Sequence, residues 1–163
     1  MSAKVHGRKS IRLGLIGSGN IWRQVYLPAV AGFGDRVEMI SVCDVSSRAV
    51  EAALAQLPSA HGYDDPREMF RNEVMDAVLV LTAEKANAAM ALVALRAGVP
   101  VFQEKPPAMS VAEWRELMAA TESGGRLYTG FNRRHTPLFR GWRFPEGARM
   151  QSVRGALLRQ GRV

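Results

Sequence analysis

The sequence contains one cysteine among its 163 residues and no long apolar run. A single cysteine cannot form an internal disulfide, and no cysteine and histidine cluster has zinc-site spacing, which excludes disulfide scaffolds and zinc fingers. A membrane span needs about 18 or more apolar residues, so none is expected. The basic residues 1–10 lack the apolar region and cleavage site of a secretory signal, so the expected location is cytoplasmic.

What the sequence does contain is an ordinary globular composition. Hydrophobic residues make up 47% and charged residues 23% of the chain, which excludes disordered and fibrous classes. The length suits one domain with a single core, or one domain plus a fragment, and it excludes two complete α/β domains.

The positive charge of the chain is unevenly distributed. The formal net charge is +7, yet residues 1–125 hold 13 Lys+Arg against 14 Asp+Glu. Residues 126–163 hold 9 Arg and only one acidic residue, Glu146. Nucleic-acid domains usually carry a basic stripe on the folded body, so nucleic acid is a disfavoured partner. The arginine-rich end is expected to contact an acidic partner segment, to bind phosphates or to be solvated.

Apolar runs and helical segments alternate along most of the chain. Strands are expected at residues 11–16, 37–43, 75–81, 99–103 and 126–130, and helices at 20–30, 47–57, 66–71, 84–97 and 111–122. This alternation predicts an α/β fold with a doubly wound parallel sheet. Residues 1–10 are expected to be a tail, 11–131 the main domain, and 132–163 a connector and the stub of a second α/β domain. Within that last part, a helix is expected at 136–142 and a strand at 150–160.

A glycine-rich turn follows the first expected strand. Its sequence is Gly17-Ser18-Gly19-Asn20-Ile21-Trp22, close to the G-x-G-x-x-G dinucleotide fingerprint. The first glycine forms the tight turn, the second lets the backbone approach a pyrophosphate, and the helix N-terminus stabilises its charge. Trp22 stands where a small residue normally permits close packing. The alternative is a tight turn that binds no ligand.

An acidic residue ends the second expected strand. Asp44 lies 22 residues after Trp22, where the fingerprint predicts a carboxylate that accepts hydrogen bonds from ribose hydroxyls. The alternative is a capping role beside Ser46. Arg48 could accommodate a 2′-phosphate, whereas Asp44 would repel it, so NAD is favoured and NADP is the alternative cofactor.

The segment Glu104-Lys105-Pro106-Pro107 follows the expected strand at 99–103, at the sheet edge where open α/β proteins bind ligands. A lysine at this position can orient a nicotinamide and donate to a substrate hydroxyl or carbonyl. The alternative is a surface lysine paired with Glu104.

These segments, together with residues 76–81, 98–106 and 130–134, resemble the Gfo/Idh/MocA family of nicotinamide-dependent sugar oxidoreductases. The resemblance implies a Rossmann domain followed by an α/β domain that supplies much of the sugar pocket. It places Lys105 near nicotinamide and substrate as the catalytic residue. Ala83 and Asn87 stand where the family commonly has Pro and His.

The resemblance implies hydride transfer between a nicotinamide cofactor and a sugar-like or polyol substrate. It ends where the second domain begins, so we expect dinucleotide binding with little turnover, and self-association through uncovered strand edges. The alternative is a non-catalytic dinucleotide-binding or regulatory module. The expected cofactor contacts are Gly17, Gly19, Asn20, Ile21, Asp44, Arg48, Thr82, Ala83, Asn87, Glu104 and Lys105, and no metal site is expected.

Overall fold

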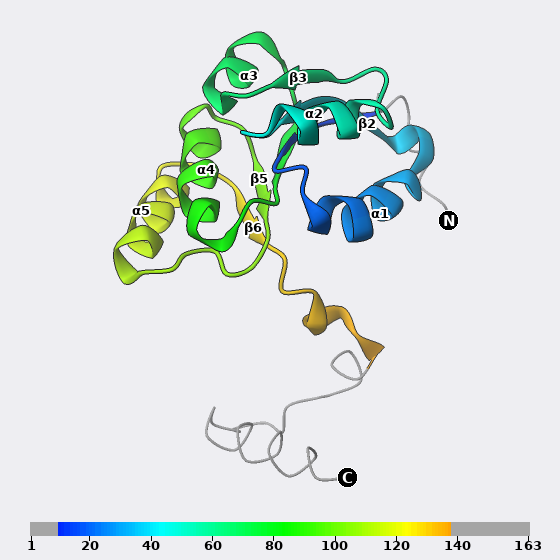
Figure 1. Cartoon of the computed structure of the whole chain (residues 1–163). Coiled ribbons are helices and arrows are strands. Elements are labelled where there is room, and N and C mark those ends of the chain that lie inside the picture. Colours follow the sequence, from blue (N-terminus) through cyan, green and yellow to red (C-terminus); the bar gives the residue numbers. More distant parts are fainter. Residues whose placement is uncertain (1–9, 138–163) are drawn as a thin grey trace, which may run out of the picture. The chain divides into compact units, whose positions relative to one another are not determined.

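The computed structural model describes residues 10–137, which include a six-stranded parallel sheet (Figure 1). Its strands are β1 (Ile11–Ile16), β2 (Val37–Cys43), β3 (His61–Tyr63), β4 (Ala77–Val80), β5 (Val101–Gln103) and β6 (Leu127–Thr129). Their order is β3-β2-β1-β4-β5-β6, and every neighbouring pair is parallel. This is the strand order of the Rossmann fold, with its switch point between β1 and β4.

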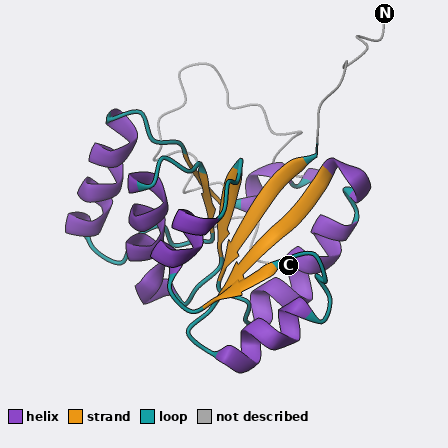
Figure 2. Ribbon diagram, turned by 90° about the horizontal axis from the view of Figure 1, so that it is seen from above, coloured by secondary structure: helices purple, strands orange, loops and turns teal. Residues whose placement is uncertain are grey.

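Helices cover both faces of the sheet (Figure 2). They are η1 (Trp22–Tyr26), α1 (Leu27–Ala31), α2 (Ser47–Leu54), α3 (Pro66–Asn72), α4 (Glu84–Arg96) and α5 (Val111–Glu122), with a short 3-10 turn η2 (Gly34–Arg36). Residues of α3, α4 and α5 share one core cluster, and residues of η1, α1 and α2 share the other. None of the helices between residues 10 and 137 is long and apolar enough to cross a membrane.

Side chains alternate between the two clusters along the central strands. Leu15, Val42 and Leu79 pack on the α2 side, whereas Ile16 and Cys43 pack on the α4 side. Both faces of the sheet are apolar, as expected for a parallel sheet that is covered by helices on each side. The expected doubly wound α/β fold is therefore confirmed.

The structure corrects several expected elements. Strand β3 was not expected, and it contains only three residues. Helix α2 ends at Leu54, before the expected Leu57, although Ser46 caps it as expected by accepting a hydrogen bond from the Ala49 N–H. Residues Asn132–His135 form a 3-10 turn, η3, in a separate unit that begins at Phe131. The helix expected at 136–142 extends beyond the described residues, and the strand at 150–160 lies wholly outside them.

Trp22 is buried, with 0% of its surface exposed, among core residues that include Leu15, Val42 and Leu79. The helix around it widens into a π-helical turn, in which the Leu27 N–H donates to the Trp22 carbonyl. Pro28 has no N–H to offer the carbonyl four residues before it, which favours such a local change of register. The indole thus packs into the core, while its Nε1 has no hydrogen-bond partner within the described part of the chain.

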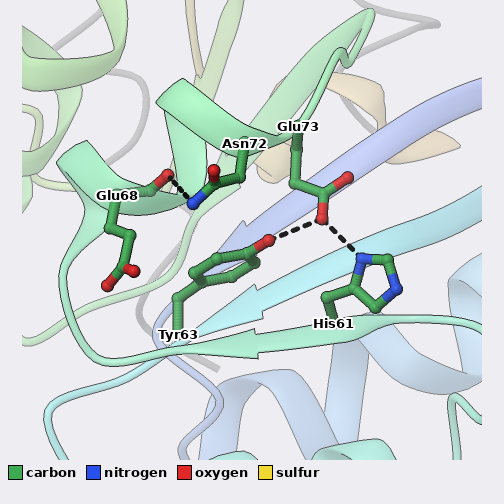
Figure 3. A network of polar contacts seen from close by, with 5 residues as sticks. All are labelled: His61, Tyr63, Glu68, Asn72 and Glu73. Atoms are coloured by element: carbon green, nitrogen blue, oxygen red, sulfur yellow. Dashed lines mark hydrogen bonds and ion pairs between the residues drawn. The ribbon is translucent and has the colours of Figure 1, made fainter.

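A polar network fixes the edge strand β3 to the end of α3 (Figure 3). The Glu73 Oε1 lies 2.6 Å from the Tyr63 hydroxyl, which donates to it, and 2.6 Å from the His61 Nδ1. Burial acts to raise the pKa of Glu73, but the hydrogen bonds from Tyr63 and His61 and the charge of His61 outweigh it and lower this pKa. The ionised carboxylate is therefore the form that the fold prefers.

A lowered pKa in the folded state makes Glu73 a source of acid sensitivity. Its stabilising contribution is complete above the ordinary glutamate pKa of about 4.3, and it is lost as the pH falls through the lower folded value. We expect Glu73→Gln to lower the free energy of unfolding by about 1–2 kcal/mol at pH 7. The loss should shrink by pH 3. Urea unfolding at both pH values measures it, with Glu68→Gln on the exposed face of α3 as control. An equal loss at both pH values would contradict this origin.

Candidate functional site

The turn after β1 lies at the switch point of the sheet. Gly17 has a φ of +92°, which L side chains rarely adopt. Its N–H donates to the Cys43 carbonyl over 2.8 Å. A Cβ built on Gly17 would lie 2.8 Å from the carbonyl carbon and oxygen of Leu81. The turn is therefore wedged between the ends of β2 and β4, and only glycine fits there.

Gly19 occupies the opposite kind of environment. A Cβ built on this residue would have no atom within 4 Å, and its φ is not positive. The fold itself therefore does not require glycine at position 19. What glycine leaves there is free space over the backbone, the feature that lets a pyrophosphate approach closely.

The Asp44 carboxylate binds the glycine turn to the end of β2. Its Oδ2 accepts hydrogen bonds from the Ser18 N–H at 2.8 Å and the Ser18 hydroxyl at 3.2 Å. Its Oδ1 accepts from the Ser46 N–H at 3.0 Å. Three of the roughly four acceptor positions of a carboxylate are thus used within the chain. Ser46 itself caps α2, so Asp44 fixes the residues that follow β1 and β2 and retains acceptor capacity on Oδ1.

A cleft of about 370 Å³ opens at this end of the sheet. Of the expected cofactor residues, Gly17, Gly19, Asp44, Thr82 and Ala83 line it. The remaining lining is mostly apolar and comprises Ile16, Cys43, Val45, Asp64, Pro66, Leu81, Ala86 and Met90. A glycine cradle with free space, a carboxylate and apolar walls fit the pyrophosphate, ribose and base of a dinucleotide.

Three other expected cofactor residues, Asn20, Ile21 and Arg48, are not among those that line this cleft. Asn20 and Ile21 begin the first helix, and the Asn20 Oδ1 accepts a hydrogen bond from the Arg23 guanidinium. Arg48 is exposed on α2. The residues that do line the cleft include no arginine or lysine.

Cys43 lines the cleft but is protonated at neutral pH. Burial first, and then the negative charges of Asp44, Asp65 and Asp64, raise the pKa of its thiol to about 12. A thiol in this state is a poor nucleophile. Its role is that of a small core residue at a strand end.

The loop after β5 carries Glu104 and Lys105, and the Lys105–Pro106 peptide is cis. The Glu104 carboxylate accepts hydrogen bonds from the Tyr26 hydroxyl at 2.6 Å and the Lys105 N–H at 2.9 Å. Burial, the hydrogen bond to Glu104 and its charge raise the pKa of Tyr26 above its ordinary value, so the phenol remains a donor. Glu104 therefore joins this loop to the helix that follows the glycine turn.

Asn87 holds the same loop in place through hydrogen bonds to its backbone. It is 1% exposed, and its Nδ2 donates to the carbonyls of Glu104 and Pro106, each at 3.3 Å. Its Oδ1 accepts from the Thr82 hydroxyl at 2.9 Å. The amide nitrogen is thus directed at the backbone on either side of Lys105, and the amide oxygen at the Thr82 side chain. Asn87 does not line the cleft; it holds the loop that carries Lys105.

The Lys105 side chain is exposed. Its ammonium forms no ion pair and no hydrogen bond with any residue in the range 10–137. The suggested pairing with Glu104 is absent there, because the Glu104 carboxylate contacts Tyr26 and the Lys105 backbone instead.

Sequence reasoning did not find two residues that matter to this site. Tyr26 is 78 positions from its partner Glu104, and nothing local signals that contact. Asp64 lines the cleft because it directly follows β3. Recognising β3 would have placed Asp64 at the carboxyl end of a strand, beside the other expected ligands.

Comparison with known proteins agrees with this geometry. Residues 11–131 match the oxidoreductase family with an NAD-binding Rossmann fold, Gfo/Idh/MocA. The chain belongs to this family. Its cofactor is accordingly NAD, as the carboxylates and the lack of cationic residues in the cleft lining favour.

Relatives in the family act on sugars and polyols according to their names. Inositol 2-dehydrogenase of Salmonella typhimurium is 29% identical over 129 residues, which cover 77% of this chain and 38% of that protein. D-glucoside 3-dehydrogenase of Escherichia coli is 29% identical over 72% of this chain and 33% of its own length. The chain thus spans well under half the length of these relatives.

A solved structure shows the same fold with its cofactor bound. The WlbA dehydrogenase of Bordetella pertussis, crystallised with NADH and UDP-GlcNAcA, superposes with a TM-score of 0.73 at 30% identity. The match covers 78% of this chain and 36% of that one.

Proposed function

We propose that this chain is the cofactor-binding part of an NAD-dependent dehydrogenase that acts on a sugar-like or polyol hydroxyl. Family membership supports the oxidoreductase class, and the names of the relatives support the substrate class. The observation that carries the proposal is the exposed Lys105 ammonium, which has no partner among residues 10–137 and extends from a loop whose backbone is held by Asn87 and Glu104 at the ligand-binding edge of the sheet.

Different residues of the cleft bind different parts of the cofactor. The glycine turn at 17–19 receives the pyrophosphate, and the remaining acceptor position of Asp44 binds an adenosine ribose hydroxyl. Thr82 and Ala83 also line the cleft. Bound NAD supplies the hydride acceptor, which this chain's own side chains cannot provide.

Lys105 performs the protein's part of the chemistry. Its ammonium donates a hydrogen bond to the oxygen of the reacting carbinol, which orients that carbon and stabilises the negative charge that develops on this oxygen as the hydroxyl proton passes to solvent water. Asn87 and Glu104 act through Lys105 as positioning residues. Because Asn87 replaces the histidine common in the family, it can fix the loop but cannot take up a proton.

A tryptophan in the glycine fingerprint would favour the regulatory alternative if its indole blocked the cleft. A tryptophan projecting into the cleft would disable cofactor binding, but this indole is buried in the core. Nothing in the lining of the cleft therefore argues for a lost cofactor site. The catalytic proposal is the better supported of the two.

Calorimetric titration of the 163-residue chain with NADH and NADPH tests the proposal. We expect saturable NADH binding with a Kd in the micromolar range, and binding of NADPH at least tenfold weaker. The 2′-phosphate would meet carboxylates with no arginine or lysine among the lining residues to neutralise it. Absence of NADH binding at millimolar concentration would contradict the proposal.

A further inference from the structure

The cleft contains a carboxylate for which the proposed cofactor contacts leave no role. Two charged residues are among those that line it, Asp44 and Asp64. Asp44 is largely occupied by Ser18 and Ser46. The Asp64 carboxylate, in contrast, accepts no hydrogen bond and forms no ion pair among residues 10–137.

The backbone position of Asp64 is fixed, although its carboxylate has no partner in the described part of the chain. It lies between Tyr63, the last residue of β3, and Asp65, which caps α3 by accepting a hydrogen bond from the Arg67 N–H at 2.7 Å. The Tyr63 carbonyl accepts from the Asp44 N–H at 3.1 Å. The hydrogen bond from the Tyr63 hydroxyl to Glu73 fixes the residue that precedes Asp64 (Figure 3). Asp64 is thus held on the wall of the cleft next to Asp44.

The order of pyrophosphate, ribose and adenine in a dinucleotide indicates which of these groups would lie next to Asp64. With the pyrophosphate at the glycine turn and the ribose at Asp44, the adenine occupies the rest of the cleft. Its flat faces suit the apolar residues there, among them Val45, Pro66 and Met90. The edge of adenine presents an exocyclic amine, a hydrogen-bond donor that a free carboxylate complements.

We propose that Asp64 recognises the adenine of the bound dinucleotide by accepting a hydrogen bond from its exocyclic amine. This assignment rests on the proposed placement of NAD in the cleft and adds a base-specific contact to it. The amine selects adenine over bases that carry a carbonyl at the same position, because a carbonyl oxygen would face the Asp64 carboxylate and repel it.

The test compares NAD with its hypoxanthine analogue, in which a carbonyl oxygen replaces the amine. Calorimetry on the full chain should give NAD at least tenfold tighter binding than the analogue, as expected for a hydrogen bond to a charged group. Asp64→Asn should reduce this ratio to within about twofold, because the amide accepts from the amine and also donates to the carbonyl. Asp35→Asn, an exposed carboxylate before β2, should keep the full ratio.

The possible failures are distinguishable. If the unchanged chain binds neither dinucleotide, the cofactor proposal is wrong, and this inference is wrong with it. If NAD binds, and Asp64→Asn changes neither the ratio of the two affinities nor the midpoint of urea unfolding, Asp64 does not recognise the adenine. A gain in NADP affinity with no change in the ratio would show that Asp64 acts only by its charge on the 2′-phosphate, which also overturns the proposal.

Discussion

Replacing Gly17 by alanine is expected to destabilise the fold by about 3–5 kcal/mol, whereas the same change at Gly19 should leave stability almost unaltered. The φ of +92° at Gly17 is costly for alanine, and its methyl group would lie 2.8 Å from the Leu81 backbone. Neither backbone can retreat easily, because both are tied into the sheet. Thermal and urea unfolding measure the difference between the two variants.

The same pair of variants separates folding from ligand binding. A methyl group on Gly19 meets no atom of the protein within 4 Å, but it fills the space through which the pyrophosphate approaches. We expect Gly19→Ala to weaken NADH binding by about 10–100-fold through lost backbone hydrogen bonds to the phosphates. Equal NADH affinity in Gly19→Ala and the unchanged chain would show that the pyrophosphate binds elsewhere.

The contrast between Gly17 and Gly19 shows which features of the glycine turn could be predicted from the sequence. The spacing of Gly17, Gly19 and Asp44 predicted a dinucleotide turn, because the fingerprint is a local pattern beside a strand. It did not reveal that Gly17 is required by the fold and Gly19 is free of the fold's constraints. That distinction depends on Leu81, which is 64 positions away and adjoins the turn only because β1 pairs with β4.

The central strands were predictable for a physical reason, and β3 was not for a related one. Strands such as β1 and β2 are buried on both faces and appear as continuous apolar runs. The edge strand β3, His61-Gly62-Tyr63, has only three residues, and two of their side chains can form hydrogen bonds. Such a short segment has no alternation of apolar and polar residues that would distinguish it from a loop. Asp64 was missed for that reason.

Trp22 shows a different limit. Its position in the fingerprint predicted a conflict, since a small residue normally stands there. The conflict is resolved by a π-helical turn and a buried indole, an adjustment over several residues that a position-by-position motif does not describe. The Asn87 amide likewise donates to the carbonyls of Glu104 and Pro106, which are 17 and 19 positions away.

Lys105→Ala should cause the largest loss of turnover. A chimera in which residues 11–131 replace the matching part of the Salmonella inositol 2-dehydrogenase provides the rest of a substrate pocket. We expect kcat to fall about 10²–10⁴-fold, as is typical when a positioned proton donor or acceptor is removed. Lys85→Ala is the matched control, because this lysine is also exposed, lies on the first turn of α4 and does not line the cleft.

The prediction separates catalysis from cofactor binding because the two depend on different loops. Lys105 extends from the loop after β5, whereas the cleft is built from the ends of β1, β2 and β4 and the turn after β3. NADH affinity of Lys105→Ala should therefore stay within about threefold of the unchanged protein while kcat falls, the pattern of an interaction made in the transition state. Turnover within about twofold of the unmutated chimera would assign the ammonium a surface role only.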